Sequence, residues 1–205
     1  MSKLSRLLVL LSSVLVLVAL ATPLWRIRLI APQYPEGLGM DIRAGSVRGA
    51  REHDLQSINS LNHYIGMKAI EPEEIEELRI IPWCIAGLAV LGFGVAAVGR
   101  RWMAIGWLAS FAVLGAVALW DFHHWEYEYG HELDRAHAII SVPGMTYQPP
   151  LIGSKQLLNF TASSWPTTGA ILIGVAFIVG CVAVTRARPR PRPEPMAKPA
   201  LEPAA

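Results

Sequence analysis

The sequence has few charged residues for its length. Only 17% of its 205 residues are Asp, Glu, Lys or Arg, whereas 53% are apolar. An average soluble domain contains about 25% charged residues, so this chain has too little polar surface for a soluble fold and is expected to lie in a membrane. The formal net charge of +2 argues against nucleic-acid binding, because binding to phosphates needs a concentrated basic face.

Cysteine is also scarce. The two cysteines, Cys84 and Cys181, each lie inside an apolar run. On the topology expected below they are near opposite membrane faces, much farther apart than the roughly 6 Å between Cα atoms that a disulfide allows, so we expect no disulfide and two small buried apolar side chains. The sequence has no CxxC, CxxCH or Gly-rich phosphate-loop motif, which argues against haem attachment and nucleotide binding.

Long apolar runs are what the sequence does contain. Four of them approach the roughly 20 residues that a helix needs to cross the hydrocarbon layer, and they cover residues 7–21, 80–98, 102–120 and 167–185. We interpret the first run as a membrane span. A cleaved signal peptide is the alternative, because Ala19-Leu20-Ala21 resembles a cleavage site.

These runs divide the chain into six segments. They are a first transmembrane helix (1–25), a first periplasmic loop (26–79), a transmembrane helical hairpin (80–120), a second periplasmic loop (121–166), a fourth transmembrane helix (167–185) and a disordered, basic, Pro-rich cytoplasmic tail (186–205).

Basic residues indicate the orientation. Lys3 and Arg6, then Arg100-Arg101, then the arginines of the tail all fall on one side of four spans, and an excess of Lys and Arg marks the cytoplasmic side. We therefore expect an all-α, multi-pass protein of the bacterial inner (plasma) membrane. It would have four transmembrane helices, two mixed extracytoplasmic loops and cytoplasmic N and C termini.

The two loops carry mixed local patterns. Residues 27–30 alternate as a strand does, Pro and Gly over 31–40 predict turns, and 54–64 has helical apolar spacing with Gly66 as its stop. In the second loop, the polar residues after Trp120 continue the preceding helix. Residues 151–160 are amphipathic, and we expect them to lie along the membrane surface.

Histidine and methionine are the candidate metal ligands, since all six histidines fall in the two loops. His63 and Met67 are four residues apart, which puts an imidazole and a thioether on one helical face, and these ligands suit copper. Met40 and Met145 are further thioethers on the same side. The alternative is that Met67 packs against the bundle and that His63 only forms a local hydrogen bond.

A second candidate metal site follows the third apolar run. Asp121, His124, Glu128 and His131 are spaced by three, four and three residues, so they share one face of a helix that reaches His131. Paired acid-x-x-His motifs of this kind bind iron in helical bundles. The alternative is a solvated helix face at the membrane interface, because iron and zinc sites draw ligands from several helices.

Three sequence segments are distinctive. They are Ala31-Pro-Gln-Tyr-Pro-Glu-Gly-Leu-Gly-Met40, Ile58-Asn-Ser-Leu-Asn-His-Tyr-Ile-Gly-Met67 and Pro143-Gly-Met-Thr-Tyr-Gln-Pro-Pro-Leu-Ile-Gly153, the last followed by Lys155-Gln-Leu-Leu-Asn-Phe160. They resemble an uncharacterised family of bacterial four-span membrane proteins related to the NosB-type proteins of atypical (clade II) nitrous oxide reductase gene clusters. The resemblance implies an accessory role beside an extracytoplasmic copper enzyme, and it assigns no catalytic residue.

The leading functional hypothesis is therefore a non-enzymatic membrane accessory protein. It would assist maturation, copper supply or docking of a periplasmic copper enzyme such as nitrous oxide reductase, in contact with the lipid bilayer and a membrane or periplasmic protein partner. Two alternatives remain open at this point. One is a structural or electron-transfer subunit without metal, and the other is a membrane metalloenzyme that uses the stripe of Asp121, His124, Glu128 and His131.

Overall fold

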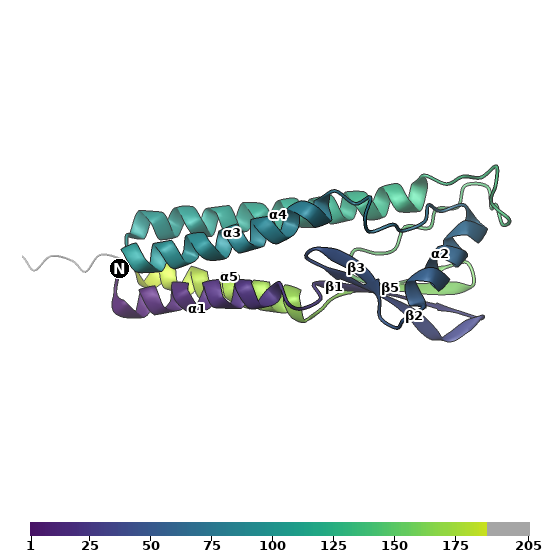
Figure 1. Cartoon of the computed structure of the whole chain (residues 1–205). Helices are drawn as coiled ribbons and strands as arrows, with labels where there is room; N and C mark the ends of the chain where they lie inside the picture. The colour runs from purple at the N-terminus through teal and green to yellow at the C-terminus, as the bar shows by residue number, and fades with distance from the viewer. Residues whose placement is uncertain (188–205) are drawn as a thin grey trace, which may run out of the picture.

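The computed structural model describes residues 1–187, in which a helical bundle and a sheet domain lie end to end (Figure 1). The helices are α1 (Lys3–Ala19), α2 (Asp54–Ile65), α3 (Glu77–Val98), α4 (Arg101–His131) and α5 (Thr168–Arg186). The strands are β1 (Trp25–Ala31), β2 (Tyr34–Arg43), β3 (Ser46–Gly49), β4 (Gly153–Leu157) and β5 (Phe160–Pro166). The tail predicted over 186–205 falls outside the described residues from 188 onward.

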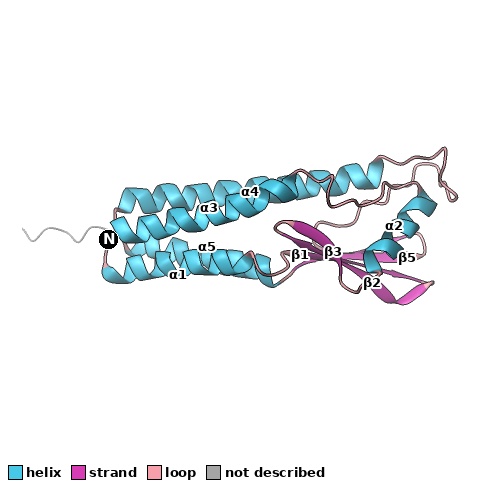
Figure 2. Cartoon of the chain, in the orientation of Figure 1, coloured by secondary structure: helices cyan, strands magenta, loops and turns pink. Residues whose placement is uncertain are grey.

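The expectation of an all-α protein is wrong. The chain is mixed, because the two segments expected to be loops supply five strands that join in one antiparallel sheet, as Figure 2 shows in magenta. The residues expected to be turns over 31–40 lie mostly in β2, and the residues expected to lie along the membrane over 151–160 contain β4. Short strand segments are hard to recognise locally, since their backbone hydrogen bonds are made with distant residues.

The expectation of four transmembrane helices is also wrong. Within residues 1–187, three helices are long and apolar enough to cross a membrane, namely α3, α4 and α5, and they indicate a multi-pass membrane protein. The first apolar run forms α1, which has 17 residues and is about 25 Å long. It lies alongside α3 and α5 in the bundle.

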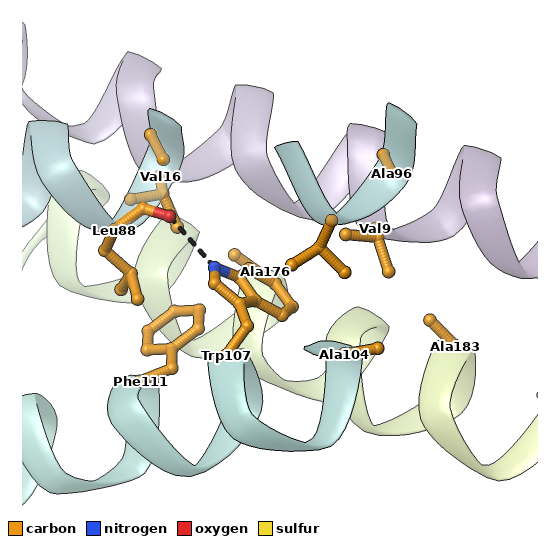
Figure 3. Packing of buried hydrophobic residues seen from close by; sticks show 11 residues of the cluster. Val9, Val16, Leu88, Ala96, Ala104, Trp107, Phe111, Ala176 and Ala183 are labelled. Atoms are coloured by element: carbon orange, nitrogen blue, oxygen red, sulfur yellow. Dashed lines mark hydrogen bonds between the residues drawn. The ribbon is translucent and has the colours of Figure 1, made fainter. Parts of the chain in front are cut away.

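The bundle core is made of small and aromatic side chains. Figure 3 shows Trp107 of α4 among alanines and valines of the neighbouring helices, with its indole N–H donating to the Leu88 carbonyl at 2.9 Å. A Cβ on Gly92 of α3 would overlap Ser13 of α1. The absence of a side chain at this position therefore lets α1 and α3 pack closely.

Arg6 connects α1 to the end of α3. Its Nε donates to the Ala96 carbonyl at 2.7 Å, and its Nη2 donates to the Ala97 carbonyl. These carbonyls belong to the last turn of α3, where the helix has no further N–H group to donate to them. A cation also interacts favourably with the negative end of the helix dipole, so Arg6 stabilises this end of α3.

Tryptophans lie at both ends of the expected membrane region. Trp102 follows the turn between α3 and α4, whereas Trp83, Trp120 and Trp165 lie toward the sheet domain, and all four are more than half exposed. Trp102 and Trp120 are separated by about 27 Å along α4, close to the thickness of the hydrocarbon core. Tryptophan is enriched at both membrane surfaces, and this spacing agrees with that preference.

The sheet combines both halves of the chain. Its strand order is β3-β2-β1-β5-β4, and β1 pairs with β2 on one side and with β5 on the other, with Trp25 opposite Pro166. Burial alternates along β1, where Ile27 and Ala31 point inward while Arg26 and Arg28 point outward, as a strand with one solvated face requires.

Helix α2 covers the buried face of the sheet. Its first residue, Asp54, accepts a hydrogen bond from the Gly39 backbone N–H of β2 at 2.9 Å, so the carboxylate joins the helix to the sheet. The helix ends at Gly66, whose φ of 76° is readily adopted only by glycine. The predicted helix over 54–64 and its stop are confirmed.

Candidate ligand cavity

The C-terminal end of α4 is the third wall of the sheet domain. The helix continues past Trp120 to His131, as expected, and its aromatic residues Phe122, Trp125 and Tyr129 pack on the sheet core. The rings of Trp25 in β1 and Phe122 lie 5.3 Å apart. A helix that is continuous with a candidate membrane span thus positions this domain directly.

A partly enclosed cavity of about 510 Å³ lies between the sheet, α2 and this end of α4. Most of its lining is apolar and comes from elements far apart in the sequence, including Leu29 of β1, Leu61 of α2, Trp125 of α4 and Phe160 of β5. Its size is within the range of small-molecule sites, about 300–1,000 Å³.

The candidate copper ligands fall into two groups. Met40 is buried, Met67 is half-buried, and both line the cavity. His63 is exposed on α2 and Met145 is half-buried in the segment before β4, and neither belongs to the cavity lining. The structure therefore places the two thioethers Met40 and Met67 at one cavity and leaves His63 and Met145 elsewhere.

The stripe on α4 is paired only in part. His124 Nε2 lies 3.2 Å from Glu128 Oε1, while the His131 ring stacks on Tyr127 at 3.9 Å between centroids and its Nδ1 lies 2.8 Å from the Tyr127 carbonyl. Within residues 1–187, no three His, Cys, Asp or Glu side chains come close enough together to hold a metal ion. Of the four residues, the structure brings His124 and Glu128 into contact.

Glu126 is the chemically unusual residue of the cavity. It is 0% exposed although it is a carboxylic acid. Its Oε1 lies 3.5 Å from the Ser164 hydroxyl of β5, and its Oε2 has no hydrogen-bond partner among the described residues. A buried polar atom without a partner is destabilising, so this carboxyl group needs an explanation.

Burial is the larger effect and raises the pKa of Glu126 from 4.5 to about 8, while the contact with Ser164 acts in the lowering direction. The surrounding hydrogen bonds agree with a neutral carboxyl. Trp25 Nε1 donates to Ser164 Oγ at 2.7 Å, and Ser164 Oγ lies 3.1 Å from its other acceptor, the Leu151 carbonyl oxygen. Because Ser164 has one hydroxyl proton and two acceptors, at 3.1 Å and 3.5 Å, the longer contact leaves Glu126 only weakly hydrogen-bonded.

Tyr147 is the second polar group of the cavity. It is 3% exposed, it lines the cavity, and its hydroxyl has no hydrogen-bond partner among the described residues. The Tyr147 N–H donates to the Gly130 carbonyl at 2.9 Å, and this hydrogen bond holds the segment against the end of α4. A Cβ on Gly130 would overlap the Gln148 backbone. The segment around Gln148 can therefore cross the last turn of α4 this closely only because residue 130 is glycine.

Sequence inspection did not single out Glu126 or Tyr147. A signal for Glu126 was present, because Phe122, Trp125, Glu126 and Tyr129 have the i, i+3, i+4, i+7 spacing of one helical face. An acid on such an aromatic face is expected to be buried. Tyr147 had no comparable signal, since only the tertiary structure brings its segment against α4.

Comparison with known proteins finds no match for this chain among protein-family models or among curated protein sequences.

Proposed function

We propose that this protein is a non-enzymatic accessory protein of the bacterial inner membrane that assists an extracytoplasmic copper enzyme such as nitrous oxide reductase. The observation that carries the proposal is the single sheet built from both inter-helix segments and packed on the outer end of α4. Such a domain has a fixed position relative to the membrane, which favours specific docking because little conformational entropy is lost on binding.

Charge supports an extracytoplasmic sheet domain. Arg100 lies in the turn between α3 and α4, Arg101 begins α4, and Arg6 and Arg186 lie at the same end of the bundle. Because an excess of Lys and Arg marks the cytoplasmic side, the opposite end faces outward. Alkaline phosphatase fused after Gly144 should therefore be active and the same enzyme fused after Arg101 inactive. The reverse pattern would refute this orientation.

Copper supply is supported by the two thioethers at the cavity. Met40 and Met67 both line it, and they end two of the sequence segments that carry the resemblance described above. Thioether sulfur is a soft ligand that suits copper(I), and an apolar cavity does not favour hard, strongly hydrated cations.

Anaerobic copper(I) titration of the purified protein tests this form of the proposal. Replacing Met40 and Met67 by leucine keeps the apolar volume nearly unchanged and should weaken binding at least tenfold. The control variants His63→Ala and Met145→Leu should bind as the parent does, since neither residue lines the cavity. Deletion of the gene should lower the copper content of nitrous oxide reductase, and added copper should restore it. A parent protein that binds no copper(I) would refute copper supply.

Docking without metal is the second candidate, and an exposed apolar patch at the far end of the sheet domain favours it. Tyr64, Ile139 and Ile140 are 48%, 65% and 49% exposed, and the Ile140 N–H donates to the Tyr64 carbonyl at 2.8 Å. Exposed aromatic and branched side chains held together in this way are typical of protein interfaces.

Co-purification with nitrous oxide reductase tests docking. Replacing Ile139 and Ile140 by serine should reduce the recovered partner about tenfold, whereas replacing the lipid-facing Val90 and Leu91 of α3 by alanine should not. Equal recovery from the parent and the serine variant would exclude this patch as the docking surface.

A further inference from the structure

The cavity of the sheet domain has two polar side chains that neither copper supply nor docking uses. Its lining is mainly apolar, yet two side chains that are 0% and 3% exposed, Glu126 and Tyr147, each have a polar atom without a partner. Both residues line the cavity. In folded proteins, most buried polar groups have a hydrogen-bond partner, so a ligand is the natural partner for these two atoms.

The position of the cavity indicates where such a ligand comes from. Trp125 lines the cavity and is five residues beyond the exposed Trp120, about 8 Å along the helix axis. Trp120 and Trp165 are exposed at this end of the bundle, and exposed tryptophans prefer the membrane surface. The cavity is therefore within reach of molecules dissolved in the bilayer.

The polar groups indicate the kind of ligand head. Tyr147 carries a hydroxyl proton, and a carboxyl surrounded by apolar side chains is favoured in its neutral form, so both groups can donate a hydrogen bond. Two donors in an apolar cavity are complementary to an uncharged oxygen acceptor. An anionic head would need desolvation beside a group that resists ionisation.

We propose that the cavity binds an uncharged lipid-soluble molecule with a hydroxyl or carbonyl head, whose oxygen accepts hydrogen bonds from Glu126 and Tyr147 while its apolar body lies against the sheet and α2. The membrane supplies this ligand, and the cavity holds it next to the extracytoplasmic face. The proposal rests on Glu126 and Tyr147, which neither copper supply nor docking uses, although the residues named for copper supply and docking line the same cavity.

Photolabelling with three matched probes tests the proposal. The protein is reconstituted in lipid nanodiscs and exposed to a dodecyl chain that carries a diazirine and ends in an alcohol, a carboxylate or an ammonium group. We expect the alcohol to label cavity residues at least fivefold more than the other two probes, and unlabelled dodecanol to compete. Labelled residues are identified by mass spectrometry.

Two variants and two controls make the result specific. Tyr147→Phe removes only the hydroxyl and should reduce competitive labelling threefold to tenfold, and Glu126→Leu should reduce it at least tenfold. Tyr127→Phe and Glu128→Gln change the same residue types at exposed positions of α4 and should leave labelling unchanged. Hydrogen exchange of the β1 and β5 amides checks that each variant retains its fold.

Three outcomes would overturn the proposal. Equal labelling by the three probes would show a cavity without head-group specificity, and labelling unaffected by both cavity variants would exclude the two donors. Preferential labelling by the ammonium probe, lost in Glu126→Gln, would identify a cation site instead. Copper(I) titration and photolabelling are separate measurements on the parent protein, so failure of copper binding and failure of this proposal are distinguishable.

Discussion

The helical bundle and the sheet domain of this protein are built by different physical means. In the bundle, the backbone hydrogen bonds lie within each helix except at its ends, and side-chain contacts such as Trp107 with Leu88 join the helices. In the sheet domain, β1 depends on β5, and Trp25 donates to Ser164 over 139 residues of sequence. The bundle therefore tolerates change at its lipid-facing surface, whereas the sheet domain depends on a few contacts between distant segments.

The largest difference between the two regions is expected in their response to pH. Burial holds the pKa of Glu126 at about 8, against 4.5 without burial, so between these values the unfolded chain loses a proton that the folded domain keeps. The free energy of unfolding of the sheet domain should fall by about 2–4 kcal/mol from pH 5 to pH 8 and then level off.

Glu126→Gln should remove most of this dependence, because glutamine does not titrate. Hydrogen exchange of the β1 and β5 amides over this pH range measures the effect, with the amides of α3 as an internal reference. An unchanged slope in the variant would mean that another group causes the pH dependence.

The next effect concerns two glycines of α4, one in each region. Gly130→Ala should destabilise the sheet domain by about 2–4 kcal/mol, since the new Cβ would overlap the Gln148 backbone and the crossing segment would have to move. Gly115→Ala should be neutral or slightly stabilising, because nothing lies within 4 Å of a Cβ there and alanine is the better helix former.

Thermal unfolding in detergent, combined with proteolysis of the 132–150 segment, measures this pair of variants. Equal stability of the two would contradict the close crossing at Gly130.

A smaller effect is expected for a matched pair inside the bundle. Gly92→Ala brings a methyl group against Ser13 and Trp107, whereas Gly94→Ala meets open space. We expect a loss of about 1–3 kcal/mol for the first and less than about 0.5 kcal/mol for the second. The loss should appear in the exchange of α1 amides while the sheet domain keeps its protection. Loss of protection in both regions would show that they unfold together.

The smallest effect is expected for the cysteines. Cys84 is exposed on the bundle surface, Cys181 is half-buried, and both are free thiols. Replacing both by alanine should change stability by less than about 1 kcal/mol, as measured by thermal unfolding. A disulfide between them on a non-reducing gel would contradict the helix arrangement.

The sequence predicts the helical bundle better than the sheet domain, because helices depend on neighbouring residues and strands on distant ones. The apolar runs over 80–98, 102–120 and 167–185 coincide with α3, α4 and α5, because about 20 apolar residues in succession are a local signal. The run over 7–21 was expected to be a span of the same kind, but α1 is shorter than the other three helices. The alternation over 27–30 indicated β1 correctly, whereas β4 was mistaken for an amphipathic surface segment.

The sequence by itself determined which segments are apolar helices, that α4 continues to His131, and that α2 ends at Gly66, since each depends on residues within a few positions of one another. Only the tertiary structure decided that residues 25–49 and 153–166 share one sheet and that Met40, Met67, Glu126 and Tyr147 line one cavity. The paired strands β1 and β5 bring together residues as far apart in the sequence as Trp25 and Ser164, which are 139 positions apart. They meet because antiparallel strands satisfy each other's backbone groups whatever their separation along the chain.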